Sequence, residues 1–386
     1  MEFAYPYLLV TMMWGGLAIY QKYNADSSKR VLYSNLLAIF IFVFFFGLRG
    51  FVAYDWVGYY PEFKALPDLQ TLFTIPYSKW EWEPGFIIFA AICKSIVPDY
   101  FFFQFICVIV NTVLLINFLR RYVDNIPLAL VLFITMGGCE ITINLLRNSI
   151  AILLFANAIP YIVEKKPVKY FLVCALAYTF HSSALAYFPM YFILNRQINK
   201  YVLLAIFVVA NVVYLFHIPV LKSIILLVVD ILMPSTKQWI ESYLNFDANT
   251  GSVLSIGYIE RLLTGMLLFG YMDKLRSIRK ENNIFINSLV IYLFLFLFLS
   301  EFRTISVRCS FLFVFAYWIL WIDFIKCFQY RNNKLLFALF IGCYSLLKLY
   351  SSNNTAMSDY YNILFENHSF SERLIHFRQH YNDVKR

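Results

Sequence analysis

Residues 31–48 read VLYSNLLAIFIFVFFFGL and decide the fold class, because they contain no charged side chain. A helix of roughly 20 apolar residues crosses the hydrocarbon core of a bilayer, which is about 30 Å thick. Similar apolar runs predict further spans at 3–20, 101–119, 126–138, 145–163, 168–180, 182–194, 200–216, 254–272, 284–300, 305–325 and 334–350. Two shorter runs, 85–97 and 219–233, are bounded by prolines and could be spans, re-entrant segments or interfacial helices.

The composition of the chain agrees with this interpretation. Of its 386 residues 61% are hydrophobic and 14% charged, whereas soluble chains have about 45–50% apolar and about 25% charged residues. We therefore predict an all-α, polytopic transmembrane helical bundle with about 11 to 14 membrane segments, some of them re-entrant or broken. Residues 1–350 form the transmembrane domain and residues 351–386 a C-terminal tail.

The net charge of +9 indicates topology and not a nucleic-acid partner, because the basic residues cluster between apolar runs. Clusters within 22–30, 120–121, 165–169, 196–200, 274–280 and 326–334 are expected on the cytoplasmic side. If the chain also turns back near His181, the N-terminus, the loops 49–84 and 217–253 and the tail lie on the outer side.

The sequence contains no motif for a disulfide framework, a metal site, a nucleotide site or a serine hydrolase. The seven cysteines lie mostly in apolar runs without CxxC spacing, which indicates neither a disulfide framework nor a zinc site. GxSxG, P-loop, GxGxxG and HExxH motifs are absent from the sequence. His376 and His380 have a metal-compatible i,i+4 spacing but no third ligand, so a solvated terminal helix is the stronger interpretation. We predict no metal and no cofactor.

Three arginines, Arg49, Arg147 and Arg308, fall at the outer side under this topology. An arginine at the centre of a span costs at least about 2.5–3.5 kcal/mol. Outer arginines also cannot serve as positive-inside signals. They therefore need a partner or a function.

Other candidate residues accompany these arginines. The loop LRGFVAYDWVGYYPEF, residues 48–63, combines Arg49 with Asp55, Trp56 and Tyr59. Guanidinium groups bind phosphate oxygens, aromatic rings stack on sugars and a carboxylate can accept a hydroxyl proton. Taken alone, this loop is better explained by a snorkelling arginine in an interfacial aromatic belt. His181 could be a general base, a phosphate donor or a helix-to-helix hydrogen bond.

The order and spacing of these segments resemble the EpsG-like branch of the Wzy-type bacterial polysaccharide polymerases. The residues that carry the resemblance are the Arg49–Phe63 loop, Glu83-Pro84-Gly85-Phe86, Leu146-Arg147-Asn148-Ser149-Ile150-Ala151, Phe180-His181-Ser182-Ser183-Ala184-Leu185, Arg308 and Tyr360/Tyr361-Asn362. Ala53-Tyr54 stands where the family has Gly-Thr, and Asn148 where it has Gln.

The resemblance implies a membrane glycosyltransferase of the bacterial inner membrane with its active site on the periplasmic side. Its donor and acceptor would be oligosaccharide repeat units on undecaprenyl diphosphate, and its surroundings membrane lipids. A separate chain-length regulator stays open as a further partner. In this hypothesis Arg49, Arg147 and Arg308 hold the diphosphate, and His181 or Asp55 takes the acceptor proton. The predicted sugar contacts are Trp56, Tyr59, Glu83 and Asn148.

Two other function classes remain open. A flippase or transporter of lipid-linked oligosaccharides would also need intramembrane cations, although these should line a path from the cytoplasmic side. A membrane ligase or acyltransferase would move the sugar or an acyl group to a different acceptor.

Overall fold

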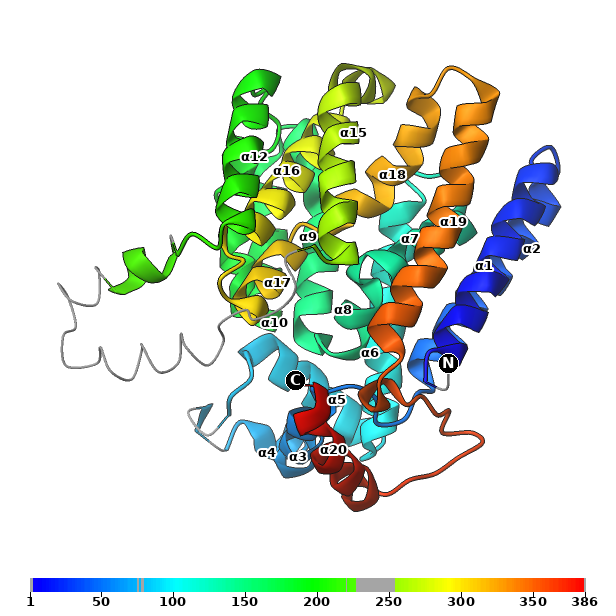
Figure 1. The fold of residues 1–386 in the computed structure, drawn as a ribbon. Coiled ribbons are helices and arrows are strands. Elements are labelled where there is room, and N and C mark those ends of the chain that lie inside the picture. Colours follow the sequence, from blue (N-terminus) through cyan, green and yellow to red (C-terminus); the bar gives the residue numbers. More distant parts are fainter. Residues whose placement is uncertain (1–2, 75, 78–79, 220, 227–253, 385–386) are drawn as a thin grey trace. The chain divides into compact units, whose positions relative to one another are not determined.

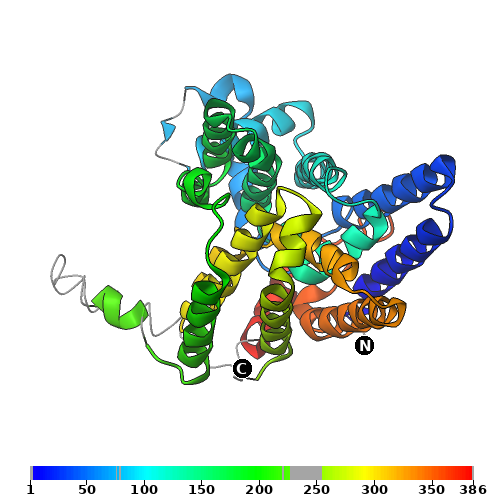
Figure 2. The ribbon, with the colours of Figure 1, turned by 90° about the horizontal axis from the view of Figure 1, so that it is seen from above.

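The computed structural model describes residues 3–74, 76–77, 80–219, 221–226 and 254–384 and confirms the predicted all-α polytopic class. Over these residues no strand forms, and Arg49 and Asn362 form an isolated antiparallel β-bridge. The chain divides into two compact units (Figures 1 and 2), Met1–Tyr191 with Phe328–Arg386, and Phe192–Cys327. The predicted loop 217–253 lies mostly outside the described residues.

The first unit contains the chain's long apolar helices. Its helices are α1 (Tyr5–Tyr23), α2 (Ser28–Phe42), α3 (Trp56–Ala65), α4 (Leu69–Leu72), α5 (Pro84–Ile96), α6 (Tyr100–Leu119), α7 (Ile126–Phe133), α8 (Cys139–Ile143), α9 (Leu146–Val163), α10 (Pro167–Phe180), α11 (Met190–Ile193), α19 (Arg331–Asn353) and α20 (Phe370–Val384). Shorter π or 3₁₀ turns are η1 (Val43–Gly47), η3 (Ile134–Gly138), η4 (Ser182–Tyr187) and η6 (Ala356–Ser358).

Five helical stretches of this unit are long and apolar enough to cross a membrane: Ser28–Gly47, Tyr100–Leu119, Ile126–Ile143, Leu146–Val163 and Arg331–Asn353. The chain is therefore a multi-pass membrane protein. Helix α5 has 13 residues, about 20 Å of helix, which is too short to cross the bilayer fully. Helix α10 ends at Phe180, where the chain was predicted to turn. The run 182–194 is not a continuous span, because the turn η4 precedes the short α11.

The two ends of the first unit differ in character. At one end, the Gln21 side chain donates to the Asp124 carbonyl and the Asn125 side chain to the Ala18 carbonyl, so the basic loops 22–30 and 120–121 are neighbours. At the other end, the Tyr7 hydroxyl donates to the Ser358 carbonyl. Helices α3, α4 and α20 gather there (Figure 1). The basic loops and the loop 49–66 therefore lie at opposite ends of this unit.

The second unit contains α12 (Lys200–Leu215), α15 (Ile256–Ile278), α16 (Asn282–Phe298), α17 (Arg303–Phe311) and α18 (Phe315–Cys327). Residues Thr304–Phe311 and Phe315–Cys327 pass the apolarity test together but are bent by 66°. This bend agrees with the predicted presence of broken membrane segments.

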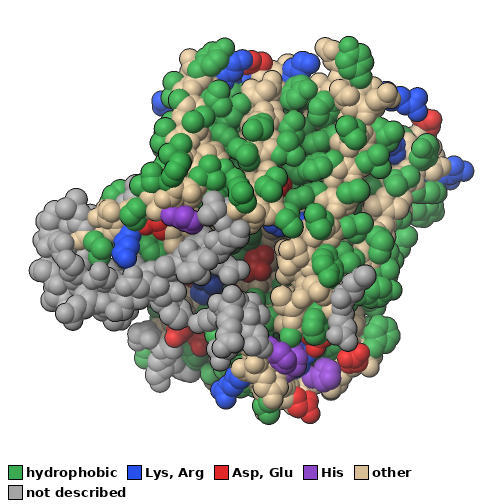
Figure 3. Space-filling model, viewed as in Figure 1, with side chains coloured by type: hydrophobic (Ala, Val, Ile, Leu, Met, Phe, Trp, Pro, Cys, Tyr) green, Lys and Arg blue, Asp and Glu red, His purple; other side chains and the backbone are tan. Residues whose placement is uncertain are grey.

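Apolar side chains cover the outward faces of the long helices on the face shown in Figure 3. Exposed leucines and valines follow the length of α19 in the first unit and of α12 in the second, for example Leu336 and Val209. Such a surface suits contact with lipid chains, and charged side chains are found mainly near the helix ends (Figure 3).

Candidate active site

An ion pair between Arg147 and Glu83 forms the centre of the candidate site. The Arg147 Nη1 atom donates to Glu83 Oε2 at 2.7 Å, and both side chains are about one-fifth exposed. Arg147 lies in the first turn of α9, and Glu83 is the residue before α5. Among the described residues, Nη2 of Arg147 takes part in no hydrogen bond, so the guanidinium keeps a donor for a ligand.

Gly85 permits the close helix approach that brings Glu83 to this place. A Cβ atom on Gly85 would lie 2.3 Å from the Thr179 hydroxyl oxygen and 2.8 Å from the Thr179 carbonyl oxygen. The start of α5 can therefore press against the end of α10 only without a side chain at position 85. In the short motif Glu83-Pro84-Gly85, Glu83 provides the carboxylate, Pro84 begins α5 and Gly85 allows contact with Thr179 of α10.

The second carboxylate oxygen of Glu83 binds the turn after α10. Ser182 donates its backbone N–H to Glu83 Oε1 at 2.8 Å. Burial tends to raise the pKa of the Glu83 carboxyl, but the Ser182 amide and the charge of Arg147 outweigh it and hold that pKa below its ordinary value. His181 adds to this lowering. The carboxylate is therefore ionised and joins α9 to the His181 turn.

The His181 turn is also tied to α9 by a polar contact. His181 Nδ1 lies 2.7 Å from the Ser183 hydroxyl, which lies 3.0 Å from the amide oxygen of Asn148. Asn148 follows Arg147 and is only 4% exposed. The predicted residues Arg147, Asn148, Glu83 and His181 therefore form one connected cluster.

Helix α3 brings Tyr59 and Asp55 to the same region. The Tyr59 ring lies under the Arg147 guanidinium, 5.9 Å from its central carbon, and the Tyr59 hydroxyl lies 3.5 Å from Nε. Asp55 precedes α3, and the Asn144 side chain accepts hydrogen bonds from the backbone N–H groups of Tyr54 and Asp55. Because Asn144 lies three residues before Arg147, one short segment positions both helix starts.

The structure places Arg49 apart from this cluster. Its side chain is 1% exposed and its terminal nitrogens donate to the carbonyls of Phe46, Thr142 and Ile143 at 2.5, 3.1 and 3.4 Å. These contacts join the π turn η1 to the segment before α9. The predicted diphosphate contact of Arg49 finds no support in this arrangement, because the guanidinium is committed to backbone carbonyls.

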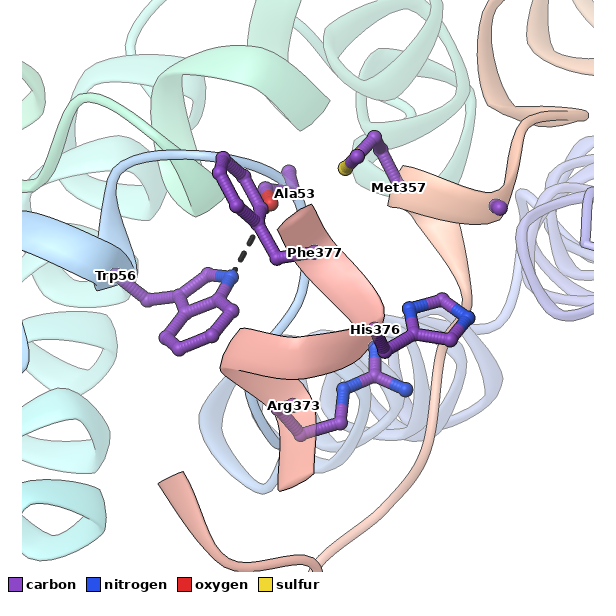
Figure 4. Close-up of a pocket in the computed structure, with 7 residues that line it drawn as sticks. Ala53, Trp56, Met357, Arg373, His376 and Phe377 are labelled. Carbon is purple, nitrogen blue, oxygen red and sulfur yellow. Dashed lines mark hydrogen bonds between the residues drawn. The ribbon is translucent and has the colours of Figure 1, made fainter. Parts of the chain in front are cut away.

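Trp56 likewise has a packing position. It is 5% exposed, its Nε1 donates to the Ala53 carbonyl at 3.1 Å, and its ring contacts Phe370 and Phe377 of α20. Figure 4 shows Trp56 beside Phe377, with Arg373 and His376 of α20 around a cavity of about 10 Å³, near the size that holds one water. The predicted sugar contact of Trp56 therefore stays a prediction without a geometric basis.

The C-terminal segment holds the loop before α3, and the sequence did not indicate this role. Arg373 pairs with the Asp359 carboxylate at 2.7 Å and donates to the Phe51 carbonyl at 3.0 Å. A Cβ on Gly50 would lie 1.9 Å from the Tyr361 ring. In the sequence, only the Tyr361-Asn362 motif pointed to this segment, and it did not indicate contact with the loop before α3. The interpretation of α20 as a solvated helix is therefore incomplete, because its Phe370, Arg373 and Phe377 face is packed.

Arg308 belongs to the second unit. It lies on α17, the first half of the bent helix pair, and its side chain is exposed. Its grouping with Arg147 stays a prediction.

Comparison with known families identifies the family of this chain. The sequence model of the EpsG family matches residues 32–364. The chain belongs to the EpsG family. EpsG is a family of Wzy-like polymerases, so membership implies a polysaccharide polymerase-like function, and the match includes every residue of the cluster around Arg147. Comparison with curated proteins and with solved structures gives no match.

Proposed function

We propose that this EpsG-family protein joins oligosaccharide repeat units carried on undecaprenyl diphosphate at the outer face of the bacterial inner membrane. The growing glycan leaves its lipid diphosphate while a hydroxyl group of the incoming unit attacks the anomeric carbon. Such a reaction needs cationic donors at the diphosphate and a group that accepts the hydroxyl proton.

The arrangement of Arg147 supports this proposal most directly. Its guanidinium lies in the first turn of α9, where unpaired N–H groups and the positive end of the helix dipole favour an anion. The ion pair with Glu83 fixes one edge of the guanidinium and leaves Nη2 for a phosphate oxygen. Arg147 thus combines a permanent charge with a fixed orientation.

Two groups are candidates for the proton acceptor, Asp55 and His181. His181 is part of the Arg147 cluster through Ser183 and Asn148, and Asp55 lies one helical turn before Tyr59, whose hydroxyl is 3.5 Å from Arg147 Nε. The separation of the basic loops from this cluster within the first unit supports an active site on the periplasmic side, since positive loops stay in the cytoplasm.

The test uses purified protein in lipid nanodiscs with lipid-linked repeat units as substrate. A ladder of lengthened products is expected, and Arg147→Ala should abolish it. Arg147→Lys should also impair elongation, because lysine cannot bind two oxygens in the planar geometry of a guanidinium. Movement of the lipid-linked units across a vesicle membrane without any ladder would instead identify a transporter.

A further inference from the structure

One ring nitrogen of His181 accepts a hydrogen bond from a backbone amide. The residue follows α10 with an extended backbone, φ −157° and ψ 129°, and its side chain caps the 3₁₀ turn η4. Ser183 donates its backbone N–H to His181 Nδ1 at 3.1 Å. The Ser183 hydroxyl oxygen lies 2.7 Å from the same nitrogen.

The hydrogen bond from the Ser183 N–H to Nδ1 determines which ring nitrogen of His181 carries the proton. A peptide N–H always donates and its direction is set by the main chain. A nitrogen that accepts this hydrogen bond cannot itself carry a proton. In a neutral imidazole exactly one nitrogen is protonated, so the His181 proton resides on Nε2.

The Asn148 side chain is compatible with this tautomer after a half-turn of its amide. If the Ser183 hydroxyl donates its proton to Nδ1, it cannot also donate to Asn148. The Ser183 oxygen must then accept a hydrogen bond from the NH₂ group of Asn148. The amide oxygen and nitrogen occupy nearly equivalent positions, and the contact is 3.0 Å long. The opposite tautomer would point the Nδ1 proton at the Ser183 N–H and leave that backbone donor without an acceptor.

We propose that His181 acts as a hydrogen-bond donor through Nε2–H to an oxygen of the lipid diphosphate, and that the Asp55 carboxylate takes the proton of the acceptor hydroxyl. This inference rests on the proposed function. The new bond forms between the acceptor oxygen and the anomeric carbon, and the bond from that carbon to the diphosphate oxygen breaks. The electron pair stays on the diphosphate, where Arg147 and His181 stabilise it, and the hydroxyl proton passes to Asp55.

The contacts around the two residues agree with this division of roles. The residue after His181, Ser182, donates its backbone N–H to Glu83, the ion-pair partner of Arg147, so His181 belongs to the phosphate side of the cluster. Asp55 lies one helical turn from Tyr59 and is partly exposed.

The first experiment measures the tautomer itself. Protein with ¹⁵N-labelled histidine is reconstituted in nanodiscs at a pH at which histidine is neutral, and the ring nitrogens are observed by solid-state NMR. The His181 signals are those missing from the spectrum of His181→Gln. A protonated Nε2 and an unprotonated Nδ1 are expected, and a protonated Nδ1 would overturn the proposal. This readout needs no substrate, so it remains informative if the protein makes no polymer.

The second experiment separates a donor from a base by elongation rate. The Gln amide can place an N–H near the position of Nε2, whereas Phe offers no donor. His181→Gln should keep elongation within about tenfold of wild type, while His181→Phe should lose about a hundredfold, as when one donor to a developing charge is removed. Equal inactivity of the two variants, in proteins whose size-exclusion profile matches wild type, would overturn the donor role.

The proposed role of Asp55 has its own test. Asp55→Asn keeps the shape of the side chain and removes its basicity, so elongation should fall by about a hundredfold or more. The activity of Asp55→Asn should also lose the rise with pH that titration of a base gives to the wild-type rate. Wild-type elongation by Asp55→Asn would overturn the assignment.

Discussion

Glu83 and Arg147 lie 64 positions apart in the sequence, and their side chains form an ion pair with 2.7 Å between Oε2 and Nη1. The same carboxylate accepts the Ser182 N–H. One charged group therefore joins the starts of α5 and α9 to the turn that carries His181, and the orientation of Arg147 depends on it.

Glu83→Gln should reduce elongation by about tenfold or more, because a hydrogen bond to a charged group contributes about 1.5–3 kcal/mol. The amide keeps the size of the side chain but removes the charge that holds Arg147. The rate of ladder formation in nanodiscs measures the effect. Glu81→Gln is the matched control, because Glu81 is an exposed acid two residues earlier. Wild-type elongation by Glu83→Gln would contradict the role of the ion pair.

Gly85→Ala should weaken both folding and activity. The added methyl group would meet Thr179 at 2.3 Å from its hydroxyl oxygen, and overpacking of this kind costs about 1–3 kcal/mol. The start of α5 must then move away from α10, and Glu83 moves with it. Thermal unfolding in detergent and elongation are the measurements. Gly58→Ala on α3, with no atom within 4 Å of its Cβ, should leave both unchanged.

Features that depend on local sequence pattern, namely the helical class and the turn after α10, could be predicted from the sequence. Apolar runs identified the helical class, and the polar break after Phe180 identified the turn at His181. The motifs around Glu83, Arg147 and His181 were predicted to share a site, and the structure connects them through hydrogen bonds.

The direction of individual side chains could not be predicted in the same way. Arg49 and Trp56 have residue types that suit a phosphorylated sugar, yet both point into packed surroundings. Arg49 meets the carbonyls of Thr142 and Ile143, some 90 residues later in the chain. Such contacts depend on tertiary structure, and no local periodicity encodes them. The docking of Arg373 on Phe51 was missed for the same reason.

Arg373→Met should detach the C-terminal helix α20. The substitution keeps the apolar stem but removes the contacts to Asp359 and to the Phe51 carbonyl, a loss of about 1.5–3 kcal/mol for each bond to a charged group. Limited proteolysis should cut the segment 359–384 faster in this variant. The control is Arg378→Met, because Arg378 is exposed on the same helix. Equal proteolysis of both variants would show that Arg373 does not hold the helix.

Docking of α20 should also weaken in acid because of His376. Burial lowers the pKa of the His376 imidazole, and the positive charge of Arg373 and the neighbouring His380 lower it further, while Asp359 opposes them. The docked state therefore favours the neutral ring, whereas the undocked helix binds a proton near the ordinary pKa of about 6.5. As the pH falls through that value the undocked state gains protons first, so docking is lost towards low pH.

Hydrogen exchange of residues 370–381 between pH 8 and pH 5 measures this effect. Protection should decrease below about pH 6.5, the ordinary histidine pKa. His376→Gln should remove most of the dependence, because glutamine does not titrate. His368→Gln serves as the comparison, since His368 is the partly exposed histidine outside α20 whose nitrogen lies 3.4 Å from Glu366. If protection falls equally in wild type and His376→Gln, another group controls the docking of α20.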